Sequence, residues 1–174
     1  MITGEYSIIR TAESDDAFEM GRLYDPAYPR ACLLDRKREL LVPTMDELRE
    51  LLARKDKLAG QLQVIEDRAG NARGFCALRA AETELNYAEM VLMLFEESSY
   101  QSPLADEVFE YFSRVAFVHR KHNKLMAQCL DGESAYRAFL LGKEFRSDGV
   151  QREAFFSSGR WHNLESLTRF RNQE

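Results

Sequence analysis

The chain has 174 residues, of which 45% are apolar and 30% are charged, and its formal net charge at pH 7 is -5. This length and composition predict one domain with a single core over residues 1–174. The acidic balance argues against a nucleic-acid partner, because binding to phosphates needs clustered Lys and Arg.

The cysteines and the N-terminal residues indicate the compartment. Cys32, Cys76 and Cys129 are odd in number and widely spaced, which fits a reducing setting with buried thiols better than a disulfide framework. The opening residues lack a basic region followed by an apolar run, and no stretch approaches a membrane-spanning length. We therefore expect a soluble cytoplasmic protein with no membrane partner.

The N-terminal third predicts one strand and two helices. Residues 6–10 form the strand, and Ser14 can cap a helix that turns one face to the core, made of Ala17, Phe18, Gly21 and Tyr24. Residues 25–43 are loop-like and hold three prolines, which suggests a segment that faces the substrate. The second helix begins at a capping box formed by Thr44 and Glu47.

The remaining elements alternate between strands and helices. Residues 61–66 and 72–81 form a hairpin, and 85–95 form a longer strand that is apolar on both faces and hence central. Ser102 and Pro103 open a helix that runs to about His119. A strand at 124–130, a helix at 133–142 and a final hairpin of strands 151–156 and 161–170 complete the chain. This order predicts an α/β protein with a mixed sheet and helices on both faces.

The strand and helix on either side of residues 96–102 predict an anion site. A ligand outside the carboxyl end of the strand would meet the backbone N–H groups of the first helical turn, where the helix dipole favours negative charge. The connection contains no glycine, Lys or Arg, and four carboxylates surround it: Glu96, Glu97, Asp106 and Glu107. These charges oppose an anionic ligand.

Several short segments resemble those of one acyltransferase superfamily. They are residues 9–12 with 15–17, the strand 74–78, Ser134, Gly142, Phe145, residues 149–155 and the hairpin 159–162. In their order and spacing, the chain resembles the GNAT superfamily of N-acetyltransferases, and its C-terminal half is similar to the RimJ/RimL-like branch. The match covers nearly the whole chain in element order.

The resemblance implies a GNAT-like fold with a central, mostly antiparallel sheet in which strand 85–95 splays from strand 124–130. Acetyl-CoA would be the cosubstrate, its pantetheine arm bound to the backbone of Met93, Leu94 and Phe95. Its pyrophosphate would rest on the turn and helix start, at Tyr100, Gln101, Ser102, Leu104 and Ala105.

The pyrophosphate signature of that family is eroded in this chain. The pattern R/Q-x-x-G-x-G/A falls on residues 100–105, where only the final small residue, Ala105, survives. Pro103 supplies no N–H group. The N–H groups of Leu104 and Ala105 and the hydroxyls of Ser98, Ser99 and Ser102 are the donors expected to remain.

Glu89 is the candidate general base. A carboxylate between apolar residues in mid-strand is costly unless it is paired or used, and the alternative is an ion pair with Arg79 across the hairpin. The tyrosine that the family uses as general acid would fall at Ala138 or Phe139, and the nearby Tyr136 fits the core better.

The histidines do not predict a metal site. His119 and His122 lie near a helix end without a third ligand in sequence reach, so we interpret them as cations that complement the helix dipole. A contact of this basic cluster with a phosphate of coenzyme A is the alternative. We interpret His162 as structural.

The leading hypothesis is an acyl-CoA-dependent N-acetyltransferase that acts on a primary amine of a small molecule or peptide. The alternative is a degenerate, non-catalytic GNAT-like domain that senses a ligand or binds a protein partner. An unrelated α+β scaffold is the third interpretation. The edge of the last strand, or the hairpin at Trp161, offers a surface for a homodimer.

Overall fold

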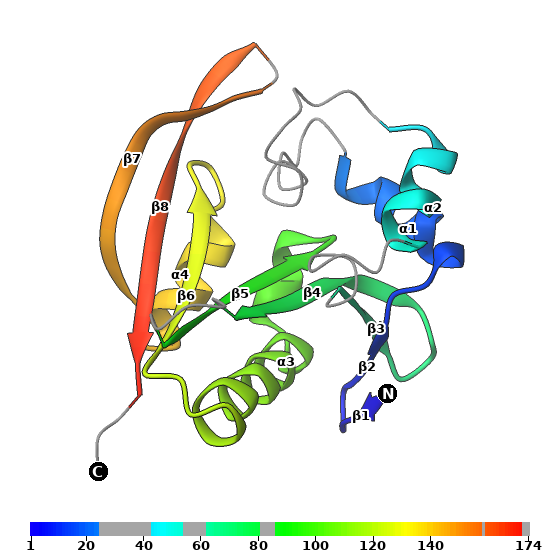
Figure 1. The fold of residues 1–174 in the computed structure, drawn as a ribbon, viewed down its shortest axis with the longest axis horizontal. Helices are drawn as coiled ribbons and strands as arrows, with labels where there is room; N and C mark the ends of the chain where they lie inside the picture. Colours follow the sequence, from blue (N-terminus) through cyan, green and yellow to red (C-terminus); the bar gives the residue numbers. More distant parts are fainter. Residues whose placement is uncertain (25–42, 54–61, 81–85, 158, 172–174) are drawn as a thin grey trace.

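The computed structural model describes residues 1–24, 43–53, 62–80, 86–157 and 159–171. Eight strands form one sheet in the order β1-β2-β3-β4-β5-β6-β8-β7 (Figure 1). The strands are β1 Ile2–Thr3, β2 Ser7–Thr11, β3 Gln63–Asp67, β4 Ala72–Ala80, β5 Tyr87–Leu94, β6 Lys124–Leu130, β7 Arg146–Ser157 and β8 Arg160–Phe170. The α-helices are α1 Ala17–Gly21, α2 Met45–Ala53, α3 Pro103–Ser113 and α4 Ser134–Gly142.

The sheet is antiparallel except at its centre. Among the strands of the described residues, only β5 and β6 run parallel, with Tyr87 opposite Lys124 and Glu89 opposite Met126. All other neighbouring strands pair antiparallel. The predicted mixed sheet, mostly antiparallel, is therefore confirmed.

Helices cover both faces of the sheet, as the sequence predicted. Successive side chains of a strand point to opposite faces, so β5 contributes to two cores. Ala88, Met90, Leu92 and Leu94 pack with α3 and α4. Val91 and Met93 face the other way and pack with α1 and α2.

Short-range signals place several helix ends as predicted. The backbone N–H of Thr44 donates to Glu47 Oε2 at 2.8 Å, and the N–H of Glu47 donates to Thr44 Oγ1 at 3.3 Å, so the capping box before α2 is present. Ser102 is the N-cap of α3 and Pro103 its first residue. Both predictions are confirmed.

Other local predictions were wrong. Phe18 was expected to face the core but is 71% exposed, because α1 is a single short turn that buries Ala17 and Met20 instead. The strand β7 begins at Arg146, five residues earlier than predicted. The end of the third helix, Arg114–His119, widens into a π-helix (η6). The predicted loop at 25–43 lies outside the described residues except at its last position.

Two further features are the state of the cysteines and the apolar character of the helices. Cys76 and Cys129 are buried and form no disulfide within the described part of the chain, and burial raises the pKa of Cys76. Among the described residues, no helix combines the length and the apolar character that crossing a membrane requires. Cys32 lies outside the described residues.

Candidate functional site

The centre of the sheet opens where β5 and β6 part. The two strands pair only from Tyr87 to Glu89 and from Lys124 to Met126. Beyond Glu89, β5 continues to Leu94 beside β4, whereas β6 continues to Leu130 beside β8. The described residues therefore contain a splay with Glu89 at its vertex, as the resemblance implied.

Glu89 faces Arg79 across the β4–β5 pairing. Arg79 Nη1 lies 3.5 Å from Glu89 Oε2, and the two side chains are 18% and 19% exposed. The ion pair that the sequence offered as the alternative is thus present, at the long end of the hydrogen-bond range. A role for Glu89 as a base stays a prediction.

The backbone of β5 alternates between its two edges. The N–H of Phe95 donates to the carbonyl of Arg73 on β4 at 3.0 Å, and Met93 pairs with Phe75. Because successive residues of a strand direct their N–H and C=O groups to opposite edges, only Leu94 of the segment 93–95 directs them toward the splay. The Phe95 ring lies under the guanidinium of Arg22, 3.9 Å from its centroid.

Tyr100 closes the splay from inside the molecule. It lies on the 3-10 turn η5, Glu97–Gln101, and is 2% exposed. Its hydroxyl accepts a hydrogen bond from the N–H of Leu94 at 3.1 Å and donates one to the carbonyl of Leu92 at 3.2 Å. The resemblance implied a pyrophosphate contact for Tyr100. Its side chain points into the core, and that contact stays a prediction.

The start of α3 satisfies its own backbone. The N–H of Ala105 donates to the carbonyl of Ser102 at 3.1 Å and to Ser102 Oγ at 3.4 Å, and that hydroxyl donates to the carbonyl of Ser99 at 2.6 Å. The expectation that Ala105 offers a free N–H was therefore wrong, because the Ser102 cap uses it. Leu104 is nearly buried and Gln101 is exposed.

Two of the four carboxylates around the loop are turned away from it. Asp106 Oδ1 lies 2.9 Å from Lys143 Nζ at the end of α4. Glu107 accepts hydrogen bonds from the backbone of Glu5, Tyr6 and Ser7 near the N-terminus. The expectation that all four oppose a ligand was wrong for these two, whereas Glu96 and Glu97 are exposed.

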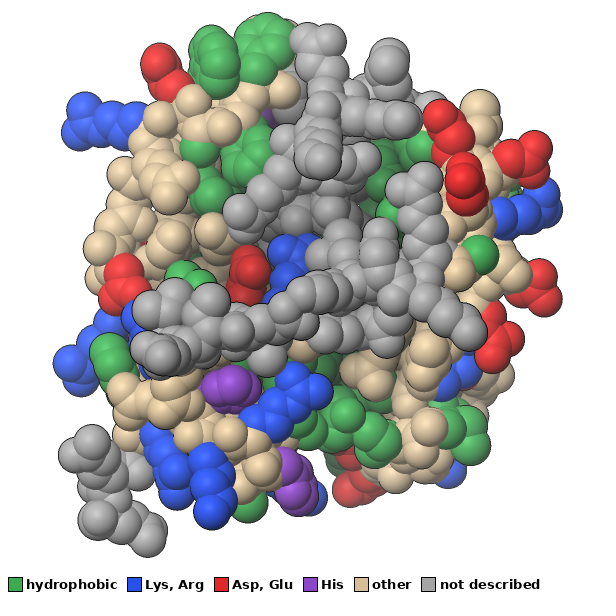
Figure 2. All heavy atoms as spheres, viewed as in Figure 1, with side chains coloured by type: hydrophobic (Ala, Val, Ile, Leu, Met, Phe, Trp, Pro, Cys, Tyr) green, Lys and Arg blue, Asp and Glu red, His purple; other side chains and the backbone are tan. Residues whose placement is uncertain are grey.

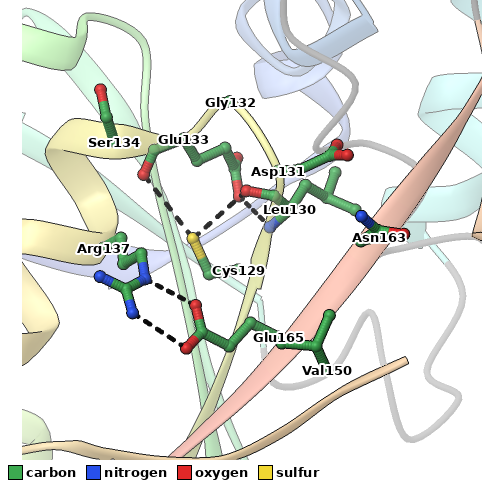
Figure 3. A pocket seen from close by; sticks show the side chains of 10 residues that line it. All are labelled: Cys129, Leu130, Asp131, Gly132, Glu133, Ser134, Arg137, Val150, Asn163 and Glu165. Carbon is green, nitrogen blue, oxygen red and sulfur yellow. Dashed lines mark hydrogen bonds and ion pairs between the residues drawn. The ribbon is translucent and has the colours of Figure 1, made fainter. Parts of the chain in front are cut away.

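A cavity of about 310 Å³ lies where β6 ends and α4 begins (Figure 3). Arg137 reaches from α4 to Glu165 on β8, with Nε 2.7 Å from Oε2, and Glu133 folds back so that its Oε2 accepts the N–H of Leu130 at 2.7 Å. The sequence analysis selected none of these residues, because the pairing of Arg137 with Glu165 joins two elements that are distant in the chain. The polar groups named here form hydrogen bonds with one another.

His162 lies beside this turn and is buried. Its Nδ1 is 2.9 Å from Asp131 Oδ1, and its Nε2 is enclosed without a hydrogen-bond partner among the described residues. Burial alone raises the pKa of Asp131, but hydrogen bonds from Asn163 and His162 outweigh it and hold that pKa below its ordinary value. The contact joins the end of β6 to the final hairpin, which fits the structural role predicted for His162.

Basic side chains gather after the third helix. Figure 2 shows Lys, Arg and His side chains together on the lower part of the face in view. His119, Arg120 and Lys121 are exposed at this end. Burial, and then the nearby Arg120, lower the pKa of His122. A contact of this cluster with a coenzyme phosphate stays a prediction.

Comparison with known proteins identifies the fold. No protein-family model matches the chain, and no curated protein matches it in sequence. A spermidine N-acetyltransferase from Vibrio cholerae, crystallised with CoA and spermine, is similar in structure, with a TM-score of 0.74, 17% identity and 96% of each chain covered. A chimera of that enzyme with hSSAT gives 0.74 at 19% identity, covering 94% of this chain and 95% of the chimera. A GNAT-family acetyltransferase from Bacillus anthracis gives 0.70 at 13% identity over 97% of both chains. The chain therefore has the GNAT fold.

Proposed function

We propose that the chain is an acyl-CoA-dependent N-acyltransferase, which transfers an acetyl group from acetyl-CoA to a primary amine of a small molecule or peptide. The observation that carries the proposal is the parting of β5 and β6 after Glu89 and Met126. Beyond these residues β6 no longer lies beside β5, and a strand edge that a neighbouring strand leaves can bind amide groups in an extended ligand.

The residues at the splay suit the pantetheine arm of the cosubstrate. Leu94 and Leu92 direct backbone groups to the edge of β5 that β6 leaves, and these groups would hold the amides of the pantetheine arm once Tyr100 releases them. The cosubstrate supplies the activated acyl thioester. The pyrophosphate would lie outside the carboxyl end of β5, near η5 and the start of α3.

Glu89 is the candidate base for the proton of the acceptor. An amine attacks the thioester carbonyl only as the free base, the C–N bond forms as the C–S bond breaks, and the thiolate that leaves takes up a proton. Glu89 at the vertex is the carboxylate that would receive the ammonium proton. Its ion pair with Arg79 holds the carboxylate at the sheet surface on the side of α1 and α2.

The acceptor class rests on chemistry and on the fold. The spermidine N-acetyltransferases with this fold act on an amine, as their names state, and one of them was crystallised with CoA and spermine. A carboxylate at the vertex favours a cationic acceptor in the same way. We therefore propose a primary amine as the acceptor of this chain.

One observation favours a second candidate, a non-catalytic domain that retains the fold. The Tyr100 hydroxyl is hydrogen-bonded to the backbone groups of Leu94 and Leu92 that the thioester arm would use, and a site that is permanently closed cannot catalyse transfer. Such a domain would bind a ligand or a protein partner elsewhere on its surface.

The test is an acetyl-transfer assay with the purified chain. Acetyl-CoA is mixed with diamines, polyamines and peptides that carry a free amine, free thiol is measured with a chromogenic disulfide, and the acetylated product is identified by mass. We expect amine-dependent thiol release above the hydrolysis background. Absence of both release and acetyl-CoA binding up to millimolar concentration contradicts the proposal and favours the second candidate.

A further inference from the structure

We propose that Tyr100 is an internal occupant of the splay, which holds the acyl-thioester site closed until the ligand displaces it. The inference rests on the proposed function, because the ligand that competes with Tyr100 is the pantetheine arm of acetyl-CoA. It makes Tyr100 an autoinhibitory side chain instead of a contact for the pyrophosphate.

The direction of the backbone groups is the first step. Phe95 donates its N–H toward β4. Leu94 and Leu92 therefore present their N–H and C=O groups at the other edge of β5, the edge that β6 leaves after Glu89. The Tyr100 hydroxyl accepts from the N–H of Leu94 and donates to the carbonyl of Leu92, as the peptide groups of an adjacent strand would.

The packing of the ring is the second step. The Tyr100 ring lies 5.0 Å from that of Tyr136 and 6.0 Å from that of Phe139, both on α4. Tyr100, Tyr136 and Phe139 are at least nine-tenths buried. The side chain thus fills the space between β5 and α4 in which a ligand bound to the edge of β5 would lie.

The element that carries Tyr100 is the third step. The turn η5 has five residues, and 3-10 hydrogen bonds have poorer geometry than α-helical ones. Three of its five residues are exposed, namely Glu97, Ser98 and Gln101. A short turn at the surface can rearrange without unfolding β5 or α3.

These steps predict competition between Tyr100 and the ligand. In the free protein, the hydroxyl stabilises the closed state by two hydrogen bonds inside the core. In the bound protein, the ligand makes those bonds and the hydroxyl lies elsewhere. Removing the hydroxyl therefore destabilises only the free state and tightens binding.

The experiment compares wild type with Tyr100→Phe by calorimetric titration with acetyl-CoA and with S-acetyl-pantetheine, which carries the arm alone. We expect Tyr100→Phe to bind both probes about tenfold more tightly or better, because Leu94 and Leu92 lose a partner that the ligand restores. Tyr111→Phe, on the neighbouring helix α3, is the matched control and should leave both affinities within twofold of wild type. Circular dichroism and thermal unfolding establish that each variant is folded.

Three outcomes of this titration would count against the inference, and they bear differently on the proposed function. Equal binding by wild type and Tyr100→Phe overturns the inference, since the hydroxyl then does not compete, but the acyltransferase proposal stands. No binding of either probe by the folded Tyr100→Phe variant at millimolar concentration overturns both. Weaker binding by the variant assigns Tyr100 to the ligand contacts and also overturns the inference.

Hydrogen exchange at Leu94 provides an independent measurement. The Leu94 amide donates to Tyr100 in the closed state, so it should exchange faster in free Tyr100→Phe than in free wild type. Addition of S-acetyl-pantetheine should restore protection in the variant. Identical exchange in both free proteins would show that the hydroxyl does not hold this edge.

Discussion

The carboxylate of Glu107 in α3 is bound to Ser7 in β2: Oε2 lies 2.7 Å from the backbone nitrogen and 2.5 Å from Oγ. The backbone N–H of Glu5 donates to the other oxygen, Oε1, at 2.5 Å. Hydrogen bonds to a charged group contribute about 1.5–3 kcal/mol, so we expect Glu107→Gln to lower the free energy of unfolding by about 2 kcal/mol in urea at pH 7. Glu110→Gln, an exposed change on the same helix, should stay within about 0.5 kcal/mol of wild type.

The same contact predicts a dependence on pH. Burial alone raises the pKa of Glu107, but the hydrogen bonds from Ser7, Glu5 and Tyr6 outweigh it and lower that pKa. The stabilisation is therefore complete above the unfolded-state pKa of about 4.3 and is lost as the pH falls through the lower folded-state pKa. The stability difference between wild type and Glu107→Gln should shrink between about pH 5 and pH 3. A constant difference would show that the charge is not its source.

Gly4 is packed against this carboxylate. A Cβ added at Gly4 would lie 2.2 Å from the carboxyl carbon of Glu107, which its hydrogen bonds hold in place. We expect Gly4→Ala to be destabilising in wild type and nearly neutral in a Glu107→Ala background, which removes the clash. The double-mutant cycle should give a coupling of about 1 kcal/mol or more in urea unfolding. Additive effects would contradict the packing described.

The sequence predicted the elements whose signals are local. The period of the apolar residues located the central strand and the helix after Pro103, and the capping box fixed the start of α2. The pairing of Arg79 with Glu89 was also foreseen, because hairpin strands place such residues opposite each other.

The orientation of the loop residues was not predictable from the sequence. Tyr100 lies on a 3-10 turn, and its partners depend on how that turn meets α4. Glu107 finds Ser7 from 100 residues away in the chain. A list of carboxylates near a turn therefore leaves out the partners that the fold brings from elsewhere.

Variants of Glu89 and Arg79 distinguish a role of Glu89 as general base from a role in the ion pair alone. If Glu89 takes the proton of the amine, Glu89→Gln should lower kcat about 10²–10⁴-fold, with little change in acetyl-CoA binding. Arg79→Met disrupts the same pair but keeps the carboxylate, and it should retain most of kcat at saturating substrate. Equal loss in both variants would show that Glu89 acts only through its ion pair with Arg79.

Asp131 joins the end of β6 to His162 in the final hairpin. Its backbone N–H donates to the carbonyl of Asn163 at 3.1 Å, and its carboxylate meets His162 Nδ1 at 2.9 Å. We expect Asp131→Asn to lower the Tm by about 2–4 °C at pH 7, which corresponds to about 1 kcal/mol, and Asp15→Asn, an exposed change, to leave it unchanged.

The pH dependence tests the origin of this effect. The folded-state pKa of Asp131 is below its ordinary value, so its contribution is present above about pH 4 and is lost as the pH falls further. The Tm difference between wild type and Asp131→Asn should therefore close as the pH approaches 3. At pH 3 the carboxyl of Asp131 in the wild type is protonated, so neither protein carries a charge at this position. A Tm difference that persists at pH 3 would therefore mean that the asparagine disturbs the turn itself.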